Sequence, residues 1–148
     1  MTTIACKDGV IAYDSQITRG DVITYDDFEK CLERDGVKFF CSGTVSDYQR
    51  LVDVYFGVKP EGSIDVSALV LDGGKLMSVA VDDASGLWKA PVMMDRTYAI
   101  GSGTPYAFAA MDMGATAVQA VEAAAKRDTS TGGTIRTVVI KAEELPQI

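Results

Sequence analysis

Short apolar-rich runs, separated by turn residues, recur along the chain, and three stretches with helical character lie between them. The short runs predict strands at residues 2–7, 10–14, 22–24, 28–32, 37–42, 67–71, 75–81, 87–90, 96–100 and 134–141. Apolar positions at helical spacing predict a helix at residues 44–56, and segments rich in alanine and methionine, separated by Gly114, predict helices at residues 106–113 and 115–127. Asp8-Gly9 and Asp35-Gly36 are turn signals that predict antiparallel hairpins. The order of elements therefore predicts an α+β fold in which helices cover antiparallel sheets.

Composition narrows the chemistry that this chain can perform. The sequence contains no histidine, so Ser-His-Asp and Cys-His catalysis and histidine metal sites are excluded. We expect no metal and no cofactor. At 148 residues and 47% hydrophobic content, the chain suits one domain over residues 1–148, burying roughly 70% of its unfolded surface. The formal charge of -7 argues against nucleic acid and anionic membranes as partners.

The three cysteines, Cys6, Cys31 and Cys41, are odd in number and lack metal-type spacing. They are typical of reduced interior residues rather than of a disulfide framework. No basic segment with an apolar stretch opens the chain, and no window approaches the roughly 20 apolar residues of a membrane span. We therefore predict a cytoplasmic protein without a membrane anchor.

A candidate nucleophile follows the initiator methionine directly. Removal of Met1, which precedes a small side chain, would leave Thr2 with a hydroxyl and a free α-amine on one residue. An α-amino group titrates near pH 8, so it could serve as the general base for the neighbouring hydroxyl. Most chains that begin Met-Thr use the threonine for no chemistry, so this hypothesis needs further residues.

Other candidate residues lie at the ends of predicted strands. Asp14 ends the second strand, which pairs with the N-terminal one, and could lie close to Thr2. Lys30 lies on the predicted strand 28–32, where a buried ammonium would need a carboxylate such as Asp14. Such a lysine could lower the pKa of the hydroxyl. Taken one at a time, Asp14 also suits a solvated acid at the end of a strand, and Lys30 suits a surface lysine, because lysine is rarely buried.

Glycine-containing turns supply the remaining candidates. Gly43 joins a predicted strand to a predicted helix, so its backbone N–H could form an oxyanion hole. The same pattern is common as plain helix capping, and the turn 101–103 has both interpretations too. The segment 128–133 ends a helix and enters the last strand, where its glycines also suit a C-cap.

Taken together and in this order, these residues resemble the proteasome β-subunit family and its bacterial relative, the HslV peptidase, which are N-terminal nucleophile hydrolases. The resemblance covers nearly the whole chain. It is carried by Thr2-Thr3-Ile4, Ala12-Tyr13-Asp14-Ser15-Gln16, Lys30, Cys41-Ser42-Gly43-Thr44, Gly101-Ser102-Gly103-Thr104-Pro105-Tyr106 and Asp128-Thr129-Ser130-Thr131-Gly132-Gly133.

The resemblance implies a role for each matching position. Thr2 would be the nucleophile of a threonine-type endopeptidase, Lys30 paired with Asp14 would lower its hydroxyl pKa, and Gly43 would donate to the oxyanion. The terminal amine and its water would be held by Ser102, Asp128 and Thr131, the last of these standing where the family usually has serine. An apolar substrate pocket would be lined by Ile17, Phe28, Cys41 and Val45.

The resemblance also implies architecture and partners. The fold would be a four-layer αββα sandwich that assembles into a self-compartmentalising homo-oligomeric ring acting on polypeptides. The family has two helices after the Gly43 loop, whereas residues 57–64 are too few for the second, so the first helical layer is expected to be shortened. That helix pair faces the end of the ring in the relatives, where an ATP-dependent unfoldase docks, so the shortening argues against such a partner.

Two alternatives remain open at this point. The chain could be a noncatalytic proteasome-like assembly subunit, which would have no need for the active-site set. It could also be an N-terminal nucleophile amidase that acts on a small amide, which favours a monomer or small oligomer.

Overall fold

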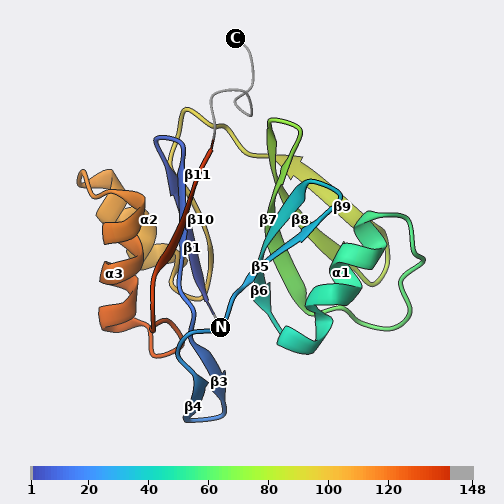
Figure 1. Cartoon of the computed structure of the whole chain (residues 1–148), viewed down its shortest axis with the longest axis horizontal. Helices are drawn as coiled ribbons and strands as arrows, with labels where there is room; N and C mark the ends of the chain where they lie inside the picture. Colours follow the sequence, from blue (N-terminus) through green and yellow to red (C-terminus); the bar gives the residue numbers. More distant parts are fainter. Residues whose placement is uncertain (1, 141–148) are drawn as a thin grey trace.

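Two antiparallel sheets packed face to face form the middle of the molecule in the computed structural model, which describes residues 2–140 (Figure 1). The first sheet has the order β10-β1-β2-β11, with β10 at Tyr98–Gly101, β1 at Thr3–Lys7, β2 at Val10–Tyr13 and β11 at Arg136–Val139. The second has the order β5-β6-β7-β8-β9, with strands at Cys31–Arg34, Val37–Gly43, Val66–Asp72, Lys75–Asp82 and Gly86–Pro91. A separate hairpin pairs β3 (Ile17–Arg19) with β4 (Val22–Tyr25).

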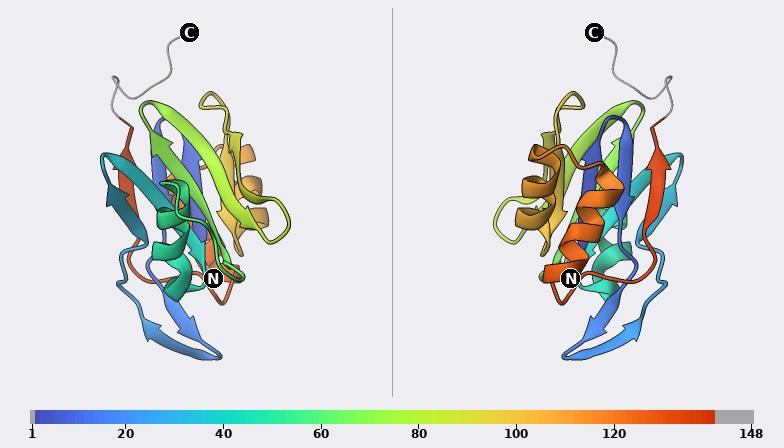
Figure 2. Two further views of the ribbon diagram at one scale, coloured as in Figure 1. Left: turned by 90° about the vertical axis from the view of Figure 1, so that its right-hand side faces the viewer. Right: turned by 90° about the vertical axis from the view of Figure 1, so that its left-hand side faces the viewer.

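Helices cover the outer face of each sheet, which gives the predicted αββα order of layers. Two helices, α2 (Thr104–Asp112) and α3 (Ala117–Arg127), lie on the first sheet, as Figures 1 and 2 show. The second sheet carries the 3-10 helix η1 (Val45–Asp47) and the helix α1 (Tyr48–Tyr55). The predicted α+β sandwich is therefore confirmed, including its shortened first helical layer, because 57–65 form no second helix.

Three hydrophobic clusters fill the spaces between the four layers. Ile4, Ile11, Phe40 and Leu69 belong to the cluster between the two sheets. A second cluster joins the first sheet to α2 and α3 through small residues, chiefly alanines. A third packs α1 on the second sheet around Phe39, whose ring meets that of Tyr55 edge to face at 5.1 Å. Each sheet is thus buried on both faces, which fixes the register of its strands.

Tight turns set the hairpins that the sequence predicts. Asp8 and Gly9 have φ values of 52° and 75°, and Asp35 and Gly36 have 52° and 79°. Two consecutive positive φ values are typical of the two-residue turns that match strand twist. The pairing of β1 with β2 and of β5 with β6 is antiparallel, as predicted.

Some predicted boundaries differ from the structure. The expected strand 28–32 begins only at Cys31, so Lys30 precedes β5 instead of lying on a strand. The expected helix 44–56 opens as the 3-10 helix η1, and the short strand β3 was not predicted. Lys141, the predicted end of the last strand, and Met1 lie outside the described residues. Within residues 2–140, no helix is long and apolar enough to span a membrane.

Candidate active site

Three buried side chains meet where β1 begins. Thr2 directly precedes β1, Asp14 directly follows β2, and Lys30 directly precedes β5. The Thr2 Oγ1 donates to Asp14 Oδ1 at 3.0 Å and accepts a hydrogen bond from Lys30 Nζ. The Lys30 ammonium also forms an ion pair with Asp14 Oδ1 at 2.9 Å, and none of the three residues has exposed surface. The structure therefore brings the predicted nucleophile, cation and carboxylate into direct contact.

The electrostatics of this cluster follow from its burial. Loss of water lowers the pKa of the Lys30 ammonium below the usual lysine value, and the Asp14 carboxylate opposes that shift. Asp14 also accepts hydrogen bonds from the Thr3 N–H at 3.2 Å and from the Gly132 N–H at 3.0 Å. Both carboxylate oxygens are thus satisfied, as a buried anion requires.

A second polar cluster surrounds the backbone nitrogen of Thr2. The Thr2 N–H donates to Ser102 Oγ at 3.2 Å, and Ser102 Oγ donates to Asp128 Oδ2 at 2.6 Å. Thr131 Oγ1 donates to the same oxygen at 2.6 Å. Partial burial raises the pKa of the Asp128 carboxyl, but hydrogen bonds from Ser102, Thr131 and the Ser130 N–H outweigh it and hold the pKa below its ordinary value. The three predicted positions lie together beside the nitrogen that would become the free amine.

Two glycines at the end of β10 and just after it make room for the N-terminal strand. A Cβ on Gly101 would collide with the Thr2 carbonyl oxygen, and one on Gly103 would collide with Thr3 Oγ1. Gly101 also has a φ of 101°, which side chains rarely adopt. The Gly101-Ser102-Gly103 turn is therefore shaped to bring Ser102 against the backbone of Thr2.

Thr3 belongs to this site, although sequence reasoning did not single it out. It is fully buried, and its Oγ1 lies 2.7 Å from Thr131 Oγ1. Because the single proton of Thr131 is given to Asp128, Thr3 must donate to Thr131. With its N–H on Asp14, Thr3 connects the two clusters. The sequence signal for Thr3 was its place directly after Thr2. Because successive strand residues point to opposite faces of a sheet, the two side chains serve different sides of the strand.

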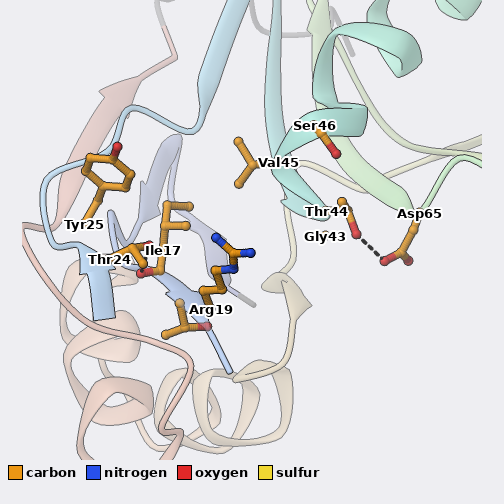
Figure 3. Close-up of a pocket in the computed structure, with 10 residues that line it drawn as sticks. Ile17, Arg19, Thr24, Tyr25, Gly43, Thr44, Val45, Ser46 and Asp65 are labelled. Carbon is orange, nitrogen blue, oxygen red and sulfur yellow. Dashed lines mark hydrogen bonds between the residues drawn. The ribbon is translucent and has the colours of Figure 1, made fainter. Parts of the chain in front are cut away.

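Gly43 ends β6 beside a pocket of about 830 Å³ (Figure 3). A side chain at Gly43, whose φ is 134°, would collide with the carbonyl oxygen of Asp65. One wall of the pocket comes from the β3–β4 hairpin and the other from the end of β6, η1 and Asp65. Its lining consists of Ile17, Thr18, Arg19, Thr24, Tyr25, Gly43, Thr44, Val45, Ser46 and Asp65.

The structure brings only some of the predicted substrate contacts to this pocket. Ile17 and Val45 lie in its lining on opposite walls. Phe28 is not among the lining residues, although its ring lies 6.2 Å from that of Tyr25. Cys41 is fully buried in the core of the second sheet and is also absent from the lining, as is Thr2.

The cysteines and acids suggest no competing chemistry. Burial raises the pKa of the thiols, to about 11 for Cys6 and about 12 for Cys31 and Cys41. A thiol needs a lowered pKa to act as a nucleophile at neutral pH. Among residues 2–140, no group of three or more histidine, cysteine, aspartate or glutamate side chains could hold a metal ion.

Two sheets between helical layers, with the start of the N-terminal strand at the polar site, define an N-terminal nucleophile hydrolase fold. Solved structures of Thiobacillus denitrificans BPH, alone and in complex with epoxomicin, match this fold with a TM-score of 0.68 each. They are 20% and 19% identical to the chain, and each comparison covers 95% of this chain and 98% of the other. No protein-family model matches the chain.

Curated relatives define the family more closely. Proteasome subunit beta 1 of Pyrobaculum aerophilum and that of Pyrobaculum neutrophilum are each 29% identical to the chain. Each alignment covers 97% of this chain and 92% of the relative, over 185 positions. Over nearly its whole length the chain is similar to proteasome β subunits, and this similarity supports a place in the proteasome β/HslV-like family. Because 185 aligned positions exceed the 148 residues of the chain, the relatives carry segments that it lacks.

Proposed function

We propose that this protein is a threonine-type endopeptidase in which Thr2, exposed by removal of Met1, is the nucleophile. The observation that carries the proposal is the buried contact of Thr2 Oγ1 with both Lys30 Nζ and Asp14 Oδ1. A hydroxyl in contact with a buried ammonium is stabilised in its deprotonated form, which is the nucleophilic one. Met1 lies outside the described residues, so its removal is part of the proposal.

The reaction starts at the hydroxyl of Thr2. The freed α-amine takes the proton of Oγ1 through a water molecule, and Oγ1 bonds to the carbonyl carbon of the substrate peptide. The carbonyl oxygen becomes an oxyanion, which the backbone N–H of Gly43 stabilises. When the C–N bond breaks, the leaving amine takes the proton from the α-ammonium. Water then attacks the resulting ester, and the acid product leaves Thr2 in its starting form.

Lys30 and Asp14 act on the nucleophile, and the second cluster acts on the base. The Lys30 charge lowers the pKa of Thr2 Oγ1, while Asp14 keeps Lys30 protonated despite its burial. Ser102, Asp128 and Thr131 hold the amine and its water, since Ser102 already accepts from the Thr2 nitrogen at 3.2 Å. Thr3 is a positioning residue, because it ties Thr131 to the strand that carries Thr2.

The assembly is proposed from the relatives, which are named as proteasome subunits. We propose a homo-oligomeric ring that encloses the active sites and cleaves polypeptides, in the cytoplasm. Because the helical layer on the second sheet consists, within residues 2–140, of η1 and α1 and is shortened, we do not propose an ATP-dependent unfoldase as partner. A noncatalytic subunit is disfavoured by the buried Lys30–Asp14 pair, which assembly does not require.

Intact-mass measurement before and after treatment with a β-lactone tests the proposal. We expect the purified chain to lack one methionine and to gain one lactone adduct per subunit, which the Thr2→Ala variant does not gain. The native mass distinguishes a ring from a small amidase. If the chain takes no adduct, although it is expressed with a competent methionine aminopeptidase, the protein is a noncatalytic subunit.

A further inference from the structure

Seven of the ten residues that line the pocket beside Gly43 have a polar or charged side chain, whereas the resemblance implies an apolar set of Ile17, Phe28, Cys41 and Val45. Half of its lining residues carry a hydroxyl, and two carry a formal charge. Ile17 and Val45 are the aliphatic residues of the lining. In a binding pocket, a small number of polar or charged groups sets the specificity, and this lining supplies such groups beside its aliphatic surface.

Arg19 supplies a positive charge that faces this pocket. Its side chain extends from β3 toward the wall that Gly43 and Thr44 form (Figure 3). Within residues 2–140, the structure gives no ion pair to Arg19, as it gives none to Arg96 and Arg127, whereas Arg34, Arg50 and Arg136 each have a carboxylate partner.

The single acid of the lining does not neutralise this charge. Asp65 lies on the opposite wall and accepts a hydrogen bond from Thr44 Oγ1 at 2.8 Å. No ion pair joins it to Arg19. The guanidinium therefore presents its donors to the pocket, in a chain whose overall formal charge is -7.

We propose that Arg19 selects peptide substrates with an aspartate or glutamate side chain near the bond that is cleaved. This deepens the proposed function and rests on it for the cleavage step. A guanidinium binds a carboxylate through two parallel N–H···O bonds, and hydroxyls such as Thr18 and Tyr25 can complete the contact. Because the chain as a whole repels acidic peptides, the preference arises from local contact and not from long-range attraction.

Peptide binding to the Thr2→Ala chain in its native assembly tests this proposal without requiring turnover. The probes are fluorescent, amide-capped peptides that are identical except for one glutamate, moved through successive positions, or glutamine in its place. At one position or more we expect the glutamate peptide to bind about fivefold tighter, as for a partly exposed charged pair. A further peptide with a free C-terminal carboxylate and no glutamate separates side-chain from terminal recognition.

Substitutions at Arg19 assign the effect to this residue. Arg19→Gln should abolish the preference for glutamate, and Arg19→Glu should favour a lysine peptide instead. Arg96→Gln, at an exposed arginine outside the pocket lining, should leave the preference unchanged. Equal affinity for glutamate and glutamine peptides at every position would overturn the proposal, as would preference for the free C-terminal carboxylate alone.

The two proposals can fail separately. A glutamate preference in a chain that takes no β-lactone adduct would refute catalysis and leave the role of Arg19 standing. An adduct without any charge preference would leave catalysis standing and refute the role of Arg19. If Arg19→Gln changes the native mass while glutamate and glutamine peptides bind alike, Arg19 serves assembly and the proposal is wrong.

Discussion

The buried ion pair between Lys30 and Asp14 allows a quantitative test of the site. Lys30→Met removes the ammonium but keeps most of the side-chain volume, so Asp14 remains buried without its cation. Breaking a buried pair from one side typically costs 3–5 kcal/mol, because the remaining charge is uncompensated. Asp14 keeps its hydrogen bonds from Thr2, Thr3 and Gly132, which places the expected loss near the lower end, at about 3 kcal/mol.

The double variant separates the charge from the loss of packing. Lys30→Met with Asp14→Asn leaves no charge in the core, so we expect it to lose much less stability than the sum of the two single variants. The coupling free energy should be about 2 kcal/mol in favour of the pair. Lys75→Met, at an exposed position on β8, is the matched control and should change stability by less than about 0.5 kcal/mol.

Denaturant unfolding at a fixed subunit concentration measures these differences, because assembly makes apparent stability depend on concentration. In thermal unfolding, a loss of about 3 kcal/mol corresponds to a decrease in Tm of roughly 6–12 °C for a chain of this size. All three active-site variants should fail to form the β-lactone adduct. If Lys30→Met loses under 1 kcal/mol, or if the single losses simply add, the two groups do not form a coupled buried pair.

Three further predictions concern the positioning and protonation of the same groups. Thr3→Val keeps the shape of the side chain but removes the proton donated to Thr131, so we expect a loss of about 1–3 kcal/mol and a changed pH dependence of β-lactone acylation. Thr3→Ser should restore the pH profile, and a profile unchanged in Thr3→Val would limit Thr3 to a structural role. Because burial lowers the pKa of Lys30, acylation should decline on the alkaline side below pH 10.5, after rising as the α-amine loses its proton near pH 8. In the same pH window below 10.5, the unfolded chain binds the proton of Lys30 more tightly than the folded chain does, so the free energy of unfolding should increase with pH. Unfolding measured at pH values from about 8 to 10.5 tests this prediction. A decrease attributable to Lys30 would contradict the direction of its pKa shift.

Local sequence patterns predicted the parts of the site that depend on strand order and turns. The Asp8-Gly9 turn fixes the pairing of β1 with β2, and that pairing places Asp14 beside Thr2. A buried ammonium needs a carboxylate partner, and this requirement predicted the contact of Lys30 with Asp14. These inferences hold because they depend on neighbouring strands and on elementary electrostatics.

Tertiary contacts decided what the sequence did not predict. The helix after Gly43 opens as a 3-10 turn, and the Thr44 side chain makes no capping hydrogen bond to it. The Thr44 hydroxyl donates instead to Asp65, 21 positions away. The strand β3 has three residues and pairs with β4 in a separate hairpin, so it is too short for a hydrophobic periodicity to identify it. The role of Thr3 depends on Thr131, which is 128 positions distant.

The energetics of burial favour a catalytic interpretation over a purely structural one. A buried ion pair is often no more stabilising than apolar residues of the same volume, so packing alone gives no reason to bury Lys30. The structure nevertheless places this ammonium on the hydroxyl of Thr2, with desolvation that lowers its own pKa. An ammonium in that position would stabilise an alkoxide of Thr2 more strongly than the same charge would in water. The buried ammonium on the Thr2 hydroxyl is therefore the feature that a noncatalytic scaffold would gain least from, and it is the feature that a threonine nucleophile requires.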